Sequence, residues 1–263
     1  MGYRFDSERH IHSLNDLPLH GTTTVLQVIS KPLTWWASGE ACKEFGWIHP
    51  DKATIQQRLD KATEFLTKFK DMKDLDYLRL LDKAYRAHKD NLDKSADAGT
   101  DLHTQVERYI QNKLKGIEML DALEFDVRLA PFIEWCNRNV TRFLWTEKCH
   151  YSEKYWTGGK SDFGYEDKQG KTVLGDIKSA KEAYFSHFVQ AGAYDLQISE
   201  NGLFEENGAI FRGALKIDYY SIFPFGKPFV QPTVVRHLEN YRLAFINALQ
   251  LYKSIQDFEK EKV

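Results

Sequence analysis

The sequence predicts an α/β fold in one domain with a helical N-terminal part. Between residues 52 and 139, apolar positions recur at helical spacing among many charged residues. After Thr141 the chain becomes rich in aromatic residues, threonine and glycine, a composition typical of strands. We therefore expect a single domain over residues 1–263, with a mainly helical part at 1–95 and a core at 96–263.

The composition is that of a globular protein with its own hydrophobic core. The 263 residues are 42% hydrophobic and 28% charged, which excludes a disordered or fibrous chain. No stretch approaches the roughly 18–20 apolar residues that cross a bilayer, so we expect no membrane partner and a cytoplasmic location. A net charge of −2 argues against a protein that coats nucleic acid, but little against an enzyme with a local basic cleft.

Helices are predicted for most of the first half. Residues 52–94 have a helical pattern, which Asp97-Ala98-Gly99-Thr100 interrupts. Thr100 or Asp101 is a suitable N-cap for a new helix, and another helix is expected over 125–139. The new helix would place one apolar stripe against the core: Leu102, Val106, Tyr109, Ile110 and Leu114.

The remaining elements are assigned from local composition. Residues 22–29, rich in threonine and valine, could begin either a strand or a helix. Residues 167–170, Asp-Lys-Gln-Gly, predict the turn of a hairpin. We expect a helix over 183–199, a long strand over 209–223 and a closing amphipathic helix over 234–259.

The chemically informative residues lie on the two strands of this hairpin. Side chains of a strand alternate between its faces. Asp176 and Lys178 therefore share one face with Leu174, and their neighbours Val173, Gly175 and Ile177 occupy the other. The hairpin brings Asp162, from the preceding strand, close to them.

Two carboxylates and a lysine on a buried sheet are costly unless a further group compensates them. A divalent cation between Asp162 and Asp176 would do so, and Mg²⁺ prefers one or two carboxylates together with waters and phosphate oxygens. The metal would lower the pKa of a bound water and stabilise charge on a phosphate. Lys178 would orient or deprotonate the water, or neutralise the charge that develops; the sequence does not separate these roles.

Asp162 followed by Asp176-Ile177-Lys178 resembles the PD-(D/E)XK nuclease superfamily. Gly99-Thr100-Asp101-Leu102-His103 is similar to the G-x-x-x-H helix of its RecB-like branch, and Gln190 with Tyr194 to that branch's Q-x-x-x-Y helix. Three N-terminal stretches look like those of phage-type exonucleases and the mitochondrial genome maintenance exonuclease: Thr22–Leu26, Lys31-Pro32 and Trp35-Trp36. The resemblance implies a restriction-endonuclease-like core, with a central mixed sheet flanked by helices.

The resemblance also implies a role for each matching residue. Asp162 and Asp176 would be catalytic metal ligands, with the Ile177 carbonyl completing the shell and Lys178 as the catalytic lysine. His103 would be a further ligand or would position the metal. Asp176 stands where many members carry glutamate, and its shorter reach could alter the metal's position. Substrate contacts would come from Ser179, Gln190, Tyr194, Trp35 and Trp36.

Several alternatives stay open. Trp35 and Trp36 could stack on unpaired bases or anchor a core. Glu107, Glu147 and Glu153 are candidate further carboxylates, or plain surface residues. The widely spaced Cys42, Cys136 and Cys149 are expected to be buried reduced thiols.

The function we expect is a Mg²⁺-dependent deoxyribonuclease, with Mn²⁺ as a possible substitute. An exonuclease that acts on linear DNA with free ends, in a bacterium or a phage-infected host cell, fits the branch better than an endonuclease. No cysteine follows Cys149, so no iron–sulfur cluster of the kind that some relatives hold is expected. The alternative is a nucleic-acid-binding or anti-defence protein that keeps the fold without cleaving. Oligomeric state and the choice between DNA and RNA are left open.

Overall fold

The computed structural model describes residues 2–30, 33–117, 129–226 and 231–262, with the backbone alone at 93–100. The chain forms two compact units: Met1–Ser30 together with Gly99–Val263, and Lys31–Ala98. In the described part, no helix is long and apolar enough to cross a membrane.

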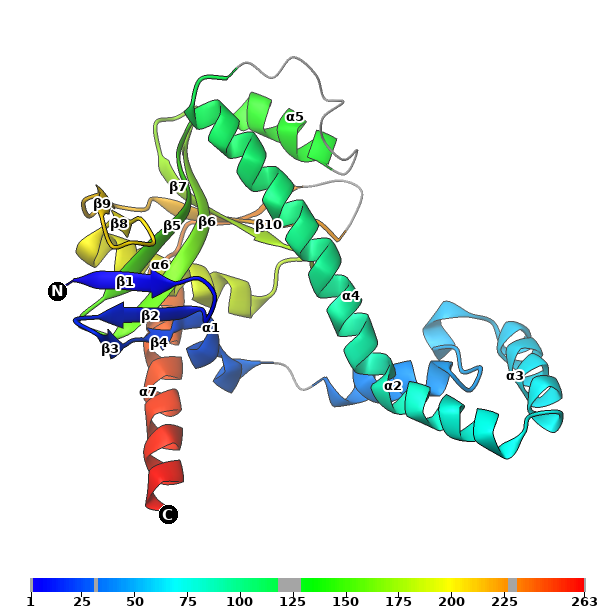
Figure 1. Cartoon of the computed structure of the whole chain (residues 1–263). Coiled ribbons are helices and arrows are strands. Elements are labelled where there is room, and N and C mark those ends of the chain that lie inside the picture. The colour runs from blue at the N-terminus through cyan, green and yellow to red at the C-terminus, as the bar shows by residue number, and fades with distance from the viewer. Residues whose placement is uncertain (1, 31–32, 118–128, 227–230, 263) are drawn as a thin grey trace. The chain divides into compact units, whose positions relative to one another are not determined.

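The first unit contains a mixed β-sheet (Figure 1). The described strands pair in the order β11-β10-β7-β6-β5-β8-β9, with β4 beside β6. β10 runs parallel to β7, and β4 parallel to β6, whereas the other pairs are antiparallel. The predicted α/β class, with a central mixed sheet flanked by helices, is confirmed. The strands are β4 (His20–Gly21), β5 (Val140–Ser152), β6 (Thr157–Asp167), β7 (Thr172–Lys178), β8 (Leu203–Phe204), β9 (Ile210–Arg212), β10 (Tyr219–Pro224) and β11 (Thr233–Val235).

Helices cover both faces of this sheet. α4 (Asp74–Leu114) and α5 (Ala130–Asn139) pack on one face through Val106, Ile110 and Phe132, which meet Phe163 and Val173 of the sheet. On the opposite face, α6 (Phe185–Asn201) packs against Trp145 and Leu174. Against α6 lie α7 (Glu239–Glu261), α1 (Thr22–Val25) and the short 3₁₀ helix Leu26–Ile29.

The N-terminal residues form a small three-stranded sheet. The sequence did not predict it. β1 (Tyr3–Asp6), β2 (Ile11–Leu14) and β3 (Leu17–Pro18) pair in sequence order. The ring of Tyr3 stacks on that of Tyr151 in β5, with centroids 4.7 Å apart. Burial of Tyr3, Phe5 and Leu14 joins this sheet to the first unit.

The second unit is helical. It contains α2 (Thr34–Lys43), the 3₁₀ turn Pro50–Lys52, α3 (Ile55–Lys70) and the first part of α4. Thr54 caps α3 in a capping box with Gln57. Its helices are joined by contacts such as Phe45 with Phe65 and the ion pair of Lys83 with Glu44.

Several predicted boundaries are wrong. The helix of residues 74–114 runs through Asp97–Thr100, so neither Thr100 nor Asp101 starts a helix. Leu114, at its end, is 42% exposed rather than buried. The turn over 167–170 is confirmed, and residues 22–29 are helical. The 125–139 prediction is matched from Ala130; residues 125–128 lie outside the described ranges.

The predicted strand over 209–223 is two strands, β9 and β10. Asp218, before β10, donates its N–H to the Thr172 carbonyl and accepts from the Thr172 N–H at 3.0 Å. β10 therefore starts where β7 supplies its partner, at the pair Tyr219 and Val173. The closing helix begins at Glu239 rather than at 234, because Thr233–Val235 pairs with β10 as an edge strand.

Candidate active site

Asp162 and Asp176 face each other across β6 and β7. The last paired residues are Phe163 and Gly175, and one step further Asp162 stands opposite Asp176. There the backbone ladder stops, and the N–H of Ile177 donates to Asp162 Oδ2 at 2.6 Å. The predicted alternation is confirmed, since Leu174 packs on the α6 side and Val173 and Ile177 on the α4 side.

Lys178 lies against the carboxylate of Asp176. Its Nζ donates to Oδ1 at 3.0 Å and stands 2.9 Å from Oδ2, which accepts no hydrogen bond from the described residues. Burial raises the pKa of Asp176 to about 7; Lys178 opposes this shift and Asp162 adds to it. Burial would lower the pKa of Lys178, but the Asp176 and Asp162 carboxylates outweigh it and the pKa is raised.

His103 comes to this pair from α4. Its Nδ1 is 3.9 Å from Asp162 Oδ2. Leu102 and Val106 are buried in the core, and this fixes the side of α4 that faces the sheet. The structure thus brings together the four predicted catalytic residues: His103, Asp162, Asp176 and Lys178.

Gln190 and Tyr194, one turn apart on α6, form a hydrogen-bonded pair. Gln190 Nε2 donates to the Tyr194 hydroxyl at 2.6 Å. Burial raises the pKa of Tyr194 well above its usual value, with further contributions from the negative charges of Asp176 and Asp162. Tyr194 packs in the same buried cluster as Leu174, two residues before Asp176 on β7.

A buried polar network stands behind Tyr194. His150 Nδ1 lies 2.7 Å from Gln197 Oε1, so Nδ1 carries the proton. Gln197 Nε2 donates to the hydroxyls of Thr22 and Thr157, and the Thr22 hydroxyl donates to the Gly158 carbonyl. The ring of His150 lies 4.7 Å from that of Tyr194.

This network also explains the two glycines that precede Asp162 on β6. A Cβ on Gly159 would stand 2.7 Å from Tyr194 and 2.8 Å from His150, and one on Gly158 would meet His12. Both glycines make room for interior side chains.

Glu147 is a site residue that the sequence left undecided. It lies on β5 opposite Asp162, between the pairs Thr146–Phe163 and Lys148–Ser161. Its φ of 50° is unusual for a non-glycine residue. Burial, followed by the Asp162 charge, raises the pKa of Glu147 to about 7, and Lys160, 3.0 Å away, opposes the shift.

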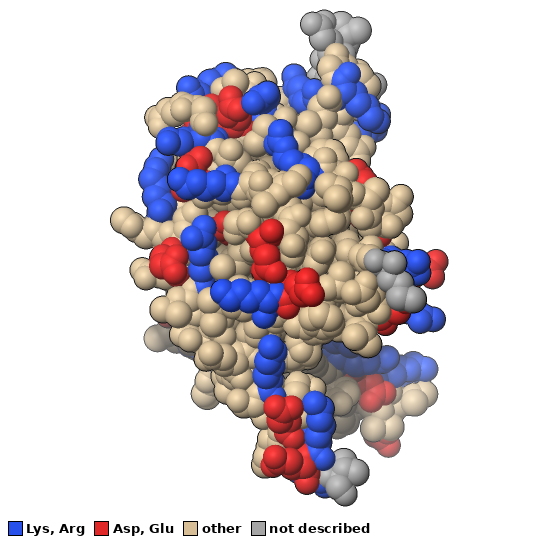
Figure 2. All heavy atoms as spheres, turned by 90° about the vertical axis from the view of Figure 1, so that its left-hand side faces the viewer, with Lys and Arg blue, Asp and Glu red and all other residues tan. Residues whose placement is uncertain are grey.

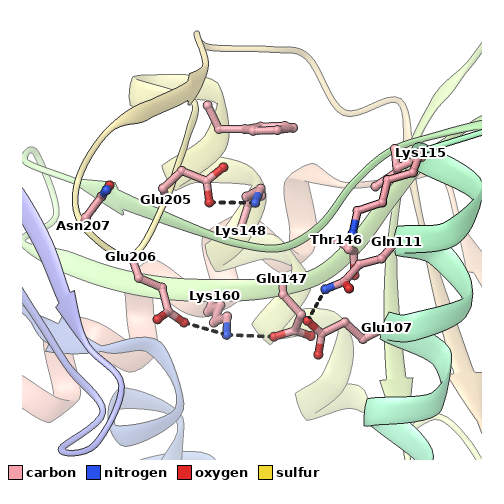
Figure 3. A pocket seen from close by; sticks show the side chains of 12 residues that line it. Glu107, Gln111, Lys115, Thr146, Glu147, Lys148, Lys160, Glu205, Glu206 and Asn207 are labelled. Atoms are coloured by element: carbon pink, nitrogen blue, oxygen red, sulfur yellow. Dashed lines mark hydrogen bonds and ion pairs between the residues drawn. The ribbon is translucent and has the colours of Figure 1, made fainter.

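A pocket of about 800 Å³ opens beside Glu147 (Figure 3). We call it the Glu147 pocket. Lys160 bridges Glu147 and Glu206 across it, while Gln111 donates to Glu107 from the α4 side. No motif marked Lys160 or Glu206, because only the tertiary fold brings β6 beside the loop after β8. Its lining also includes Asn207 and Phe211.

Other predicted residues lie apart from this cluster. Ser179 follows β7 and is exposed. Trp35 and Trp36 belong to α2 of the second unit; Trp35 is 90% exposed, so a core anchor is wrong for it, and Trp36 is 37% exposed. Glu153 is exposed, and its backbone N–H donates to Glu200. Lys31-Pro32 lies outside the described residues.

The cysteines follow the prediction in part. All three are free; Cys136 and Cys149 are buried, but Cys42 is exposed. Helix α2 carries Cys42.

The oxygen donors of this site meet part of what a divalent cation requires. Within the described ranges, no three His, Cys, Asp or Glu side chains are grouped as a metal site. The site does offer opposed carboxylates on Asp162 and Asp176, and one Asp176 oxygen that accepts no hydrogen bond from the described residues. Hard oxygen donors of this kind suit Mg²⁺. No protein-family model matches the sequence, and no curated protein matches it.

Proposed function

We propose that this chain is a Mg²⁺-dependent deoxyribonuclease with a PD-(D/E)XK core of the RecB-like kind, and that it hydrolyses DNA from its ends. The observation that carries the proposal is the placement of Asp162 opposite Asp176, with Lys178 bonded to Asp176 and His103 3.9 Å from Asp162. Residues far apart in sequence thereby lie together where β6 and β7 stop pairing, which supports the proposal.

The buried charges support a catalytic rather than a structural role. Asp176 is 2% exposed, and its pKa is raised to about 7 although an ammonium group lies next to it. Glu147 has a similarly raised pKa. Such perturbed carboxylates are costly to the fold and cluster at functional sites.

Asp162 and Asp176 would hold the metal, with the Ile177 carbonyl and His103 as further candidate ligands. When bound, Mg²⁺ supplies positive charge beside the phosphate and acidifies the attacking water. Mn²⁺ offers the same chemistry to the same oxygen donors.

The chain's own groups would position the water and the metal ligands, and would neutralise the charge that grows on the phosphate. The Lys178 ammonium provides a donor and a positive charge beside Asp176, where it orients water or stabilises charge growing on the phosphate. The Ile177 N–H holds the Asp162 carboxylate in place. Gln190 and Tyr194 brace the α6 side of the site or contact substrate.

Digestion of end-labelled oligonucleotides tests the proposal. Linear single- and double-stranded DNA, linear RNA and a closed circular single strand are incubated with Mg²⁺, with Mn²⁺ and without metal. We expect loss of linear DNA only with metal, an intact circle, and a polarity given by the label. Cutting of the circle would instead make the chain an endonuclease. Binding without cleavage in either metal would refute the enzyme and favour a binding protein on this fold.

A further inference from the structure

The Glu147 pocket lies on the β5 side of the proposed active site, next to the strand that carries Asp162. It begins at Glu147, directly across from Asp162 on the neighbouring strand. Its other wall includes Glu107, one helical turn after His103 on α4. A group that enters the pocket therefore meets Glu147 and Glu107, the neighbours of Asp162 and of His103.

The pocket's charges do not suit a phosphate. Its lining has four carboxyl groups (Glu107, Glu147, Glu205, Glu206) and three lysines (Lys115, Lys148, Lys160), so it offers no net positive charge to a phosphate. Two of the lysines are already paired: Lys160 with Glu147 and Glu206, and Lys148 with Glu205 at 2.8 Å. A terminal phosphate would bring a charge of about −1.5 to −2 at pH 7 against these carboxylates.

The rest of the lining suits an uncharged aromatic group. Phe211 is 39% exposed, and Lys148 lies 4.7 Å from its ring centroid. Gln111 and Asn207 add amides that can donate to and accept from the edge of a base. The volume of about 800 Å³ falls within the range of small-ligand sites. In Figure 3, Asn207 and the Glu206–Lys160–Glu147 chain border the same cavity.

We propose that the Glu147 pocket receives the base and sugar of the terminal nucleotide, and that the strand end enters it without a terminal phosphate. This inference rests on the proposed function, because it states which kind of DNA end the proposed active site accepts. Acidic side chains on three sides exclude the phosphorylated end, and the aromatic ring retains the base.

The test compares oligonucleotides that carry a hydroxyl or a phosphate at the degraded end. We expect the phosphate to lower kcat/KM by about tenfold or more through like-charge repulsion. Phe211→Ala should raise KM for the hydroxyl end by at least about fivefold with little change in kcat, because base stacking is lost. Glu206→Gln should reduce the difference in kcat/KM between the hydroxyl and the phosphate end, because it removes one of the repelling charges. Ile210→Ala, the neighbouring residue at 73% exposure, is the matched control and should behave as wild type.

A binding measurement tests the pocket independently of the proposed cleavage activity. Saturation-transfer NMR with deoxyadenosine and with its 5′- and 3′-monophosphates is run on wild type and Phe211→Ala. Binding of the nucleoside alone, lost in the variant, supports the pocket even if no DNA is cleaved. A cleavage rate that the terminal phosphate leaves unchanged or raises would overturn the inference and leave the nuclease proposal standing. Failure of both cleavage and nucleoside binding would overturn both.

Discussion

The backbone N–H of Ile177 donates a 2.6 Å hydrogen bond to Asp162 Oδ2. It lies where the β6–β7 ladder ends, so a side-chain oxygen satisfies an amide that no backbone carbonyl of β6 reaches. The same bond fixes the Asp162 carboxylate opposite Asp176. The local structure of the sheet and the proposed chemistry therefore depend on one side chain.

Replacement of Asp162 separates these two roles. Asp162→Asn keeps an oxygen that can accept from Ile177, so the free energy of unfolding should change by less than about 1 kcal/mol. Asp162→Ala leaves the amide without its acceptor and should cost about 1–3 kcal/mol. Both variants should lose metal-dependent cleavage. Urea unfolding together with a cleavage assay checks this, and an active Asn variant would contradict it.

Mg²⁺ should stabilise the protein more at pH 8 than at pH 5.5. Burial raises the pKa of Asp176 from its ordinary 3.8 to about 7, so without metal the ionisation of this carboxyl destabilises the fold as pH rises between these values. A cation binds only the ionised form, so its affinity should grow through this range. Thermal unfolding with and without Mg²⁺ measures the shift in Tm. An equal shift at both pH values, or one retained in Asp176→Asn, would refute the assignment.

Two buried histidines should make stability fall as pH drops below 6.5, whereas the carboxyls of Asp176 and Glu147, whose pKa values are raised to about 7, oppose this fall. Burial lowers the pKa of His12 to about 4 and of His150 to about 3, against 6.5 for an ordinary histidine. The unfolded chain therefore takes up protons that the folded chain does not, at about 1.4 kcal/mol per pH unit for each histidine. Denaturant unfolding at pH 7.5, 6 and 5 tests this. His150→Gln should lose less stability than wild type as pH falls, and the exposed His10→Asn should behave as wild type; an unchanged pH dependence in His150→Gln would contradict the prediction.

Gly159→Ala should weaken both fold and activity. The new Cβ would stand 2.7 Å from Tyr194 and 2.8 Å from His150, which are held by the buried network. Overpacking of this kind costs about 1–3 kcal/mol. Displacement of Tyr194 should also lower kcat. Gly213→Ala, with no atom within 4 Å of its Cβ, is the control. A Gly159→Ala protein as stable and active as the control would show that the interior accommodates the methyl group.

Much of the candidate site could be predicted because it depends on strand alternation and one turn. The two-residue period placed Asp176 and Lys178 on one face, and the turn at 167–170 brought Asp162 beside them. Helical spacing likewise oriented Leu102 and Val106 toward the core, and so His103 toward the sheet.

The wrong predictions and the points left open lie where distant contacts decide the structure. Asp97–Thr100 has the composition of a helix start, yet α4 continues through it. Residues 22–29 are helical because they pack on α6 and α7. The sequence of the segment alone carries no information about that packing. Lys160 and Glu206 meet only because separate strands converge, so no sequence spacing signals the Glu147 pocket.

The most direct test of the central claim is the rate of linear DNA hydrolysis in Mg²⁺ by wild type, Lys178→Ala and Lys181→Ala. Lys181 is exposed three residues further on and provides a matched loss of charge away from Asp176. The account predicts that Lys178→Ala remains folded but loses at least about 10²-fold in rate, as expected for removal of a group that stabilises charge in the transition state, whereas Lys181→Ala stays near wild type. Equal rates for all three proteins, or no hydrolysis by wild type in Mg²⁺ or Mn²⁺, would contradict it.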